Sequence, residues 1–178
     1  VLYDVVEANK PQAGFPVESL AGDFASETEA ERLAALKPDI VYHLAAIVSG
    51  EAEQNFDKGW TINARGTWYL LEALRAQNET SGGSYRPKVI FASSIAVFGP
   101  PFPDRIGDDF LCAPRTSYGA QKAMTELLVA DYARKGFIDG MSIRLPTIAG
   151  RPGKPNLAAS SFFSGIVREP LNGAEAIL

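Results

Sequence analysis

The chain has 178 residues, and its 17 Lys and Arg against 21 Asp and Glu give a formal charge of −4. Apolar residues make up 46 % and charged residues 21 %, which favours one folded, water-soluble domain with a sizeable core and excludes a disordered chain. The single cysteine, Cys112, excludes a disulfide framework. Together with the single histidine, His43, it leaves too few ligands for a Cys/His zinc site, so we expect no metal.

Targeting signals and basic runs are also missing from the sequence. No apolar run reaches membrane-spanning length, and the opening VLYDVVEANK lacks the basic flank and apolar block of a signal peptide. One cysteine fits a reducing compartment, and the mildly acidic balance does not favour nucleic acid or an anionic membrane as a partner. We therefore expect a cytoplasmic protein that binds neither nucleic acid nor membrane.

The first half of the chain alternates apolar β-branched runs with helical patterns, which predicts parallel strands joined by crossover helices. Strands are expected at 1–6, 17–21 and 39–46. The first is expected to be the end of a buried strand, and the third to be covered on both faces because its apolar residues are nearly continuous. Ser26 and Glu29 form a capping-box pattern that predicts a helix over 30–36.

The second half continues the alternation. Apolar residues at helical spacing predict a helix over 60–76, and Met124, Leu127 and Leu128 are expected to face inward from a helix over 117–135 that Gly136 ends. The remaining expected segments are a strand at 88–93, a long irregular loop at 95–114, a strand at 141–145, a loop reaching 156 and a helix at 158–168. This order predicts an α/β fold with a Rossmann-type doubly wound parallel sheet, where ligands bind beyond the carboxyl ends of the strands.

Tyr118 and Lys122 lie four residues apart, so a helix places them on one face. The spacing alone is weak, because a surface lysine packed over an exposed tyrosine gives the same pattern. Ser94 ends the strand KVIFASS, at the sheet edge where a helix beginning near Ser117 brings Tyr118 alongside. Ser93 is better read as capping the strand end or binding loop amides. His43 is better read as a core histidine, since no GxSxG nucleophile elbow accompanies it.

Several short motifs occur in a recognisable order. They are HLAA at 43–46, Asn63 with Gly66 and Thr67, SSIAVFG at 93–99, SYGAQK at 117–122 and RLPT at 144–147. Together they resemble the extended short-chain dehydrogenase/reductase family, the NAD-dependent epimerase/dehydratases, over nearly the whole chain. AAIVSGEAE at 45–53 and RPGKPN at 151–156 are similar to family dehydrogenases of small hydroxy acids such as D-erythronate. RLPT also resembles the RYPG of threonine dehydrogenases.

The resemblance implies a catalytic set of Ser94, Tyr118 and Lys122. Tyr118 would be the general acid/base, Lys122 its partner and a ligand of the cofactor ribose, and Ser94 the group that orients the substrate oxygen. A free tyrosine titrates near pH 10, so a base near neutrality needs its pKa lowered by about 3 units, roughly 4 kcal/mol in favour of the anion. Lys122 and the positive nicotinamide ring of NAD are the available cations.

NAD is the expected cofactor. Asp4 closes the first strand, where a carboxylate can accept hydrogen bonds from ribose hydroxyls and repel the extra phosphate of NADP, although it can also simply cap a turn. The resemblance places further cofactor contacts at Asp23, Leu44, Ala45, Ala46, Asn63 and Pro146.

Substrate contacts are expected at Ser49, Ser94, Arg151 and Asn156, with Lys154 in the same loop. A sugar acid needs a carboxylate receptor, and the arginine fork suits one, although a solvated surface arginine fits Arg151 equally well. Arg168 is a weaker candidate. We therefore divide the chain into an NAD-binding domain at 1–150 and the start of a smaller substrate-binding region at 151–178.

The chain departs from the family pattern at both ends. The GxxGxxG turn of the first family strand has no match, and the substrate-covering region that follows in the family is also missing, so we expect a fragment with unpaired sheet edges. Phe98 stands where the family commonly has tyrosine. The resemblance further implies a homodimer formed by the helices at 60–76 and 117–135.

The leading hypothesis is an NAD-dependent dehydrogenase of a small hydroxy acid. A nucleotide-sugar epimerase with retained NAD, using the same Ser94, Tyr118 and Lys122, is the alternative. Dehydration is disfavoured, because Ile95 and Ala96 stand where dehydratases carry an acidic pair. A non-catalytic dinucleotide sensor is a third hypothesis, and the intact catalytic set counts against it.

Overall fold

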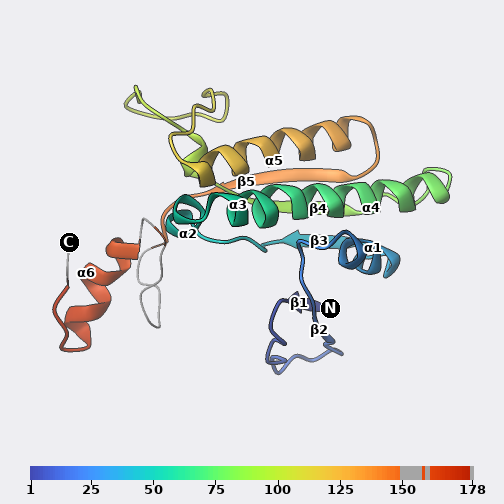
Figure 1. The fold of residues 1–178 in the computed structure, drawn as a ribbon, viewed down its shortest axis with the longest axis horizontal. Helices are drawn as coiled ribbons and strands as arrows, with labels where there is room; N and C mark the ends of the chain where they lie inside the picture. Colours follow the sequence, from blue (N-terminus) through green and yellow to red (C-terminus); the bar gives the residue numbers. More distant parts are fainter. Residues whose placement is uncertain (149–157, 159–160, 177–178) are drawn as a thin grey trace.

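The computed structural model describes residues 1–148, 158 and 161–176. Its strands form two parallel sheets, one of two strands and one of three (Figure 1). The strands are β1 (Leu2–Asp4), β2 (Ser19–Ala21), β3 (Ile40–His43), β4 (Lys88–Ser94) and β5 (Asp139–Leu145). β1 pairs with β2, and β3, β4 and β5 are neighbours in that order, all in parallel. The predicted α/β architecture with parallel, Rossmann-like strands is therefore confirmed.

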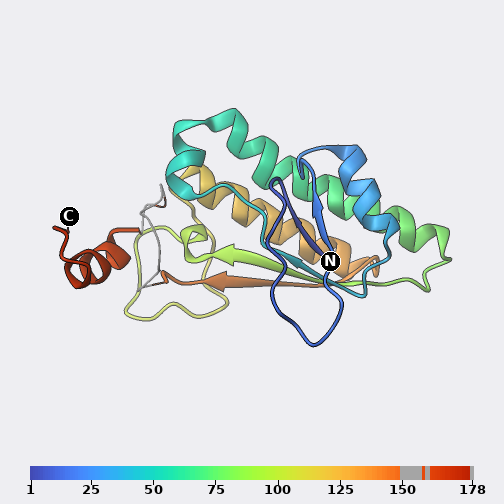
Figure 2. The same cartoon turned by 90° about the horizontal axis from the view of Figure 1, so that it is seen from below.

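The helices predicted from the sequence occur in the predicted order, while the helical segments at 49–54 and 95–97 were not predicted. They are α1 (Glu27–Ala35), α2 (Ser49–Gln54), α3 (Phe56–Gly59), the π-helical η1 (Trp60–Gly66), α4 (Thr67–Thr80), the 3-10 turn η2 (Ile95–Val97), α5 (Ser117–Arg134) and α6 (Ser161–Leu171). Figure 2 shows α1, α4 and α5 along one side of the three-stranded sheet. In the described part of the chain, no helix is both long enough and apolar enough to cross a membrane.

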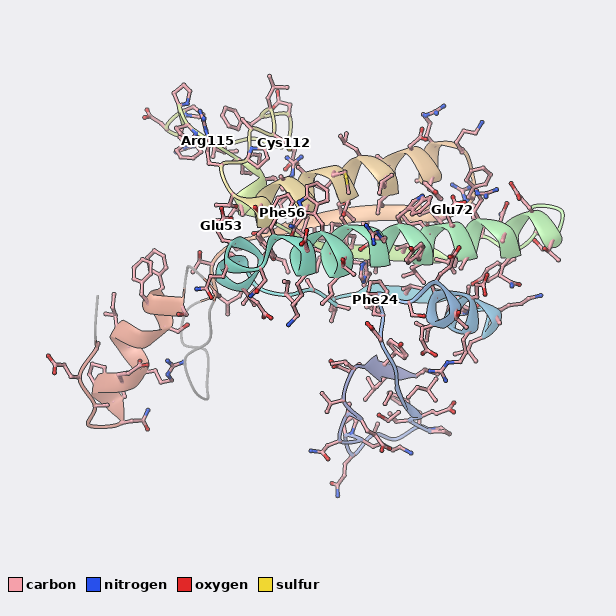
Figure 3. The ribbon with its side chains drawn as sticks, viewed as in Figure 1. Phe24, Glu53, Phe56, Glu72, Cys112 and Arg115 are labelled. Atoms are coloured by element: carbon pink, nitrogen blue, oxygen red, sulfur yellow. The ribbon has the colours of Figure 1, made fainter. Side chains whose placement is uncertain are left out.

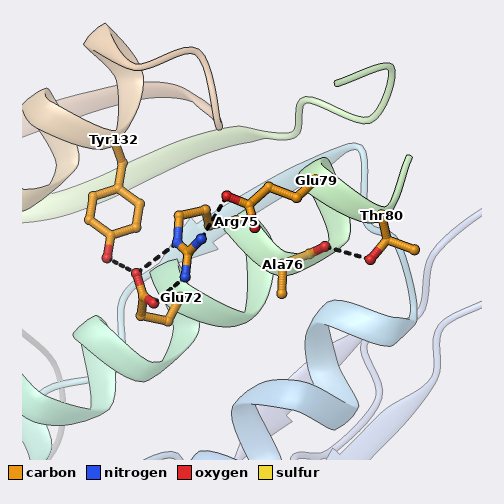
Figure 4. Close-up of polar contacts among 6 residues, drawn as sticks. All are labelled: Glu72, Arg75, Ala76, Glu79, Thr80 and Tyr132. Atoms are coloured by element: carbon orange, nitrogen blue, oxygen red, sulfur yellow. Dashed lines mark hydrogen bonds and ion pairs between the residues drawn. The ribbon is translucent and has the colours of Figure 1, made fainter. Parts of the chain in front are cut away.

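The core lies between these helices and the sheet. Its buried side chains come from α1, α4, β4 and α5, and include Ala30, Leu71, Leu74, Val89, Phe91 and Val129. Burying a side chain of the size of Leu71 or Phe91 contributes about 1.5–3 kcal/mol. α4 and α5 are also joined by polar contacts, because the Tyr132 hydroxyl donates to Glu72, which holds Arg75 at 2.7 Å (Figure 4). The core therefore fixes both long helices against β4, the strand that leads to the predicted catalytic serine.

One face of the three-stranded sheet is open, which corrects two expectations. Ile40 and Tyr42 of β3 are 49 % and 65 % exposed, while His43 is buried, so β3 is not covered on both faces. Leu2 of β1 is 36 % exposed, so the first strand is not buried either. The near-continuous apolar run could not reveal this, because coverage depends on what packs against a strand rather than on the strand itself. Among the described strands, β1–β2 and β3–β5 share no hydrogen bonds.

Helix boundaries and faces needed further corrections. The helix expected at 60–76 begins instead with α3 at Phe56, passes through the π-helical η1 and ends at Thr80. Leu127 was expected to face inward and is 73 % exposed. The inward positions of α5 are Gly119, Gln121, Lys122, Thr125 and Val129, so polar residues occupy much of the buried face. Apolar spacing alone therefore assigned the wrong side to Leu127.

The capping prediction was correct for position and wrong for contacts. α1 begins directly after Ser26, but the Ser26 side chain makes no capping hydrogen bond. Glu29 accepts instead from the Tyr3 hydroxyl at 2.8 Å and from Arg32 at 2.7 Å. Contacts with Tyr3, from a distant part of the chain, and with the neighbouring Arg32 therefore replace the capping-box hydrogen bond that we expected. At the other long helix, Gly136 ends α5 as predicted, with φ of +83°.

Candidate active site

Ser94 and Tyr118 meet at the carboxyl end of β4. α5 begins at Ser117, where the Thr116 hydroxyl accepts from the Gly119 amide at 3.0 Å as an N-cap. A Cβ on Gly119 would lie 2.2 Å from the Ala96 carbonyl oxygen, so only glycine lets the first turn of α5 approach the end of β4 this closely. The Glu53 carboxylate of α2 also accepts from the Ser117 amide at 2.9 Å (Figure 3). The start of the helix is therefore fixed on two sides.

Tyr118 is half-buried, and Ser94 is the side chain that interacts with its hydroxyl. Burial raises the pKa of Tyr118, and the interaction with Ser94 lowers it by a smaller amount because it stabilises the phenolate. Ser94 Oγ also accepts from the Ala96 amide at 3.1 Å, which orients the serine. The structure therefore brings Ser94 and Tyr118 to the same end of β4.

Lys122 lies one turn beyond Tyr118 and is 3 % exposed. Its Nζ donates to the Ala92 carbonyl oxygen at 2.8 Å, 4.6 Å from the Phe91 ring centroid and 5.5 Å from that of Tyr118. Burial lowers the pKa of the lysine to about 8, because the protein replaces most of its water shell. The ammonium is therefore close to Tyr118 but is held mainly by the strand.

Asn63 holds the loop that follows β3. It lies in the π-helical η1 and is 2 % exposed. Its Oδ1 accepts from the Ile47 amide at 2.8 Å, and its Nδ2 donates to the Ile47 carbonyl at 3.3 Å and to Gln121 Oε1 at 2.8 Å. π-helical turns often mark functional sites. Because these atoms bond within the chain, a role of Asn63 toward a cofactor would act through the loop that it holds.

Sequence reasoning missed Gln121, the residue directly before Lys122. It is fully buried between α5 and η1, and its Nε2 is 2.6 Å from where a Cβ on Gly59 would lie. The sequence could have indicated Gln121, because it is a polar residue directly beside a catalytic candidate on a predicted helix. Its partner Asn63 is 58 residues away, so local spacing could not predict their contact.

The predicted cofactor residues lie at strand ends. Asp4 ends β1 and is exposed, with its Oδ1 accepting from the Val6 amide at 3.3 Å, and Asp23 accepts from the Ala25 amide at 3.0 Å. Both carboxylates keep unused acceptor capacity. Leu44, Ala45 and Ala46 follow β3, and the first two are exposed. Pro146 is exposed directly after β5.

The predicted substrate residues divide into two groups. Ser49 is the first residue of α2 and is half-buried, next to the loop that Asn63 holds. Arg151 and Asn156, with Lys154, lie outside the described residues. Arg168 lies on α6 and forms an ion pair with Glu169.

His43 and Ser93, to which we assigned structural roles, both make contacts within the protein. His43 is 4 % exposed, its Nε2 is 2.7 Å from the Thr67 hydroxyl, and burial lowers its pKa to about 3. The prediction of a core histidine is confirmed. The Ser93 hydroxyl donates to the Glu126 carboxylate, so a side chain takes the place of the loop amides that we expected.

The parallel, Rossmann-like sheet therefore gathers Ser94, Tyr118 and Lys122 near the carboxyl end of β4, the edge at which ligands bind in sheets of this class. The chain belongs to the NAD dependent epimerase/dehydratase family, whose model matches residues 2–178. This confirms the family resemblance that the motifs indicated.

Individual relatives are also similar to the chain. It is 46 % identical to D-erythronate dehydrogenase from Haemophilus influenzae, over 99 % of the chain and 54 % of that protein. It is 46 % identical to D-erythronate dehydrogenase from Cupriavidus necator, over 90 % of the chain and 48 % of that protein. A crystal structure described as a nucleoside-diphosphate-sugar epimerase from Agrobacterium tumefaciens superposes with a TM-score of 0.91 and 57 % identity, covering 99 % of the chain and 52 % of that structure. The chain thus spans about half the length of these relatives.

Proposed function

We propose that the protein containing this chain oxidises a small hydroxy acid of the D-erythronate type with NAD. The observation that carries the proposal is the placement of Tyr118, in the first turn of α5, beside Ser94 at the end of β4, with the Lys122 ammonium 5.5 Å from the tyrosine ring centroid. The two D-erythronate dehydrogenases at 46 % identity support the substrate class.

The residues at the strand ends fit NAD by their chemistry. Asp4 and Asp23 offer carboxylate acceptors for hydroxyls of the adenosine half, and a carboxylate at the end of β1 disfavours the extra phosphate of NADP. The small side chains of Ala45 and Ala46 leave backbone accessible, and Leu44, Lys122 and Pro146 complete the proposed contacts. When bound, NAD supplies the hydride acceptor.

Tyr118 takes the proton of the substrate hydroxyl in this proposal, and Ser94 donates a hydrogen bond to the same oxygen. In the structure as it stands, burial keeps the pKa of Tyr118 above its ordinary value, and the effect of Ser94 is smaller. Even from the ordinary value near 10, a pKa near neutrality requires a shift of about 3 units, roughly 4 kcal/mol, so a positive charge beside the phenol is needed. Lys122, whose pKa is about 8, supplies one such charge when protonated.

Substrate binding completes the proposal. Ser49 lies beside the loop after β3, and Arg151 and Asn156 follow the RLPT motif. An arginine can bind a sugar-acid carboxylate through two parallel hydrogen bonds, which assigns Arg151 to the acid group.

A nucleotide-sugar epimerase is the second candidate, favoured by the 57 % identical structure described as such an epimerase. Phe98 counts modestly against it, since the hydroxyl common at that position in the family is absent. Phe98 packs instead against Phe110, with ring centroids 5.6 Å apart. A non-catalytic sensor would not require the Ser94, Tyr118 and Lys122 set.

The proposed assembly is a cytoplasmic homodimer in which α4 and α5 pair with their copies. Trp68 of α4 is 44 % exposed and Leu127 of α5 is 73 % exposed, so both helices carry apolar surface outward. Sedimentation of the full-length protein tests this, and a monomer at all concentrations would contradict it.

The test of activity is the absorbance of NADH formed by the full-length protein from NAD and D-erythronate, L-threonate, L-threonine or UDP-sugars, with Tyr118→Phe as the control. Oxidation of a four-carbon sugar acid that disappears in Tyr118→Phe supports the dehydrogenase. Interconversion of a UDP-sugar without net NADH would transfer the assignment to the epimerase and leave Arg151 without its proposed role.

A further inference from the structure

The stripe of α5 that carries Tyr118 and Lys122 continues to Glu126. These residues are spaced by four, so they lie along one face of the helix. Near the carboxyl end of β4, Tyr118 interacts with Ser94, Lys122 donates to the Ala92 carbonyl oxygen, and Glu126 accepts from the Ser93 hydroxyl. The third pair has no part in the proposed chemistry. Its two residues are nevertheless next to the site, because Ser93 directly precedes Ser94 and Glu126 lies one helical turn after Lys122.

Arg144 of β5 completes this third contact. It lies opposite Ser93 in the β4–β5 register. Its Nε is 3.1 Å from both carboxylate oxygens of Glu126, and its Nη2 is 2.8 Å from Oε2. The Arg144 and Glu126 side chains are only 26 % and 11 % exposed. A fork of this kind is charge-assisted and directional, so it restrains the rotation of α5 as well as its distance from the sheet.

The same arginine holds the long loop that follows η2. Its Nη1 donates to the Asp108 carbonyl oxygen at 3.2 Å, and its Nη2 is 3.3 Å from the Cys112 sulfur. Its guanidinium carbon lies 4.9 Å from the Phe98 ring centroid. Figure 3 shows Cys112 on this loop, beside the start of α5. One side chain therefore joins β5, α5 and the loop between Ser94 and Tyr118.

We propose that Arg144 and Glu126 are positioning residues, whose ion pair sets the register of α5 against β4 and so brings Tyr118 onto Ser94. The proposal rests on the proposed function for its kinetic test. Neither residue touches the reacting groups. Their effect passes along α5, because a helix moves as a body and a rotation at Glu126 displaces Tyr118 two turns away.

The decisive variant is the double substitution Glu126→Leu with Arg144→Leu. Removing one partner alone leaves a nearly buried charge unpaired, which destabilises the fold and blurs the result. Replacing both charges with apolar side chains removes the directional fork without leaving a charge unpaired, and the neutral Ser93 hydroxyl loses its acceptor at a smaller cost. Arg134→Leu is the matched control, since Arg134 pairs with Asp131 on the same helix at 2.5 Å, with both side chains more than half exposed.

The expected result is a double variant with a urea midpoint close to the parental value and a kcat lowered roughly 10- to 100-fold, as for a catalytic group displaced by about 1 Å. KM for NAD rises by a smaller factor, because Lys122 lies on the same face of α5. The acid limb of kcat/KM moves to higher pH, because displacement from Ser94 removes the interaction that lowers the Tyr118 pKa. The groups facing Tyr118 are Ser94 of β4 and Lys122 of α5, with Glu53 of α2 at the helix start, and none is altered. Arg134→Leu changes none of these quantities.

A second readout separates this proposal from the proposed function. Ultraviolet titration of tyrosinate, taken as the difference from Tyr118→Phe, follows the Tyr118 pKa without substrate or turnover. A shift of the titration to higher pH in the double variant supports the positioning role of Arg144 and Glu126 even if the protein oxidises no hydroxy acid. Parental kcat and an unshifted titration at parental stability would overturn it. If the double variant does not fold, Arg144→Lys, which keeps the charge but loses the fork, takes its place in the same comparison.

Discussion

Replacing Asn63 with leucine tests the contact between the loop after β3 and α5. Leucine has a similar volume, so the change removes polar bonds with little loss of packing. Asn63 makes three hydrogen bonds, two with the Ile47 backbone and one with Gln121. Their loss at a site that is 2 % exposed lowers the free energy of unfolding by about 3 kcal/mol, taking about 1 kcal/mol for each bond.

A double-mutant cycle with Gln121→Leu makes the prediction sharper. Asn63→Leu leaves the Gln121 amide buried without that partner, whereas the double variant removes both buried amides. We therefore expect the double variant to be destabilised by about 1 kcal/mol less than the two single losses together. Urea unfolding of the full-length protein measures all four free energies. The control is Asn172→Leu, because the exposed Asn172 side chain donates to the Arg168 carbonyl at the end of α6, and its loss should change stability by less than about 0.5 kcal/mol.

Two outcomes would refute this reasoning. A loss below about 1 kcal/mol for Asn63→Leu would mean that the three bonds are replaced by water, and strict additivity would mean that Asn63 and Gln121 do not interact.

Three further predictions concern the site, the core and the helix pair. Tyr118→Phe should lower turnover at least about 100-fold while NAD binding by fluorescence stays within error, and substantial activity in this variant would exclude Tyr118 as the base. His43, with a pKa near 3 when folded, should make the protein lose up to about 1.4 kcal/mol per pH unit below about pH 6.5, because the unfolded chain binds the proton. In His43→Asn that part of the slope should disappear from unfolding curves measured between pH 6 and pH 4, values that lie within the expected window. Glu72→Gln should lower the thermal midpoint by an amount equivalent to about 1 kcal/mol by weakening the Tyr132 and Arg75 contacts, whereas Glu79→Gln, at an exposed ion pair, should change stability by less than about 0.5 kcal/mol. Equal effects of the two glutamines would contradict the difference in burial.

Much of the fold was readable because its signals are local. The element order, the parallel arrangement and the glycine at the end of α5 follow from apolar runs, helical spacing and turn residues. The errors concern faces. Leu127 fits an inward apolar stripe and is 73 % exposed, while Gln121 and Lys122 are buried. The spacing of apolar residues predicts a helix, but the elements that pack against the helix determine which of its faces is buried.

The sequence by itself determined the family and the catalytic candidates, because the motifs are short, ordered and carried within single elements. Ser94 at a strand end and Tyr118 with Lys122 one helical turn apart needed only local geometry. Only the tertiary structure decided which partners position them. The Asn63–Gln121 and Glu126–Arg144 pairs join residues 58 and 18 positions apart, and such contacts are set by the packing of α5 on η1 and β5. The physical reason is that spacing within an element is a property of the backbone, whereas pairing across elements exists only once the core has closed.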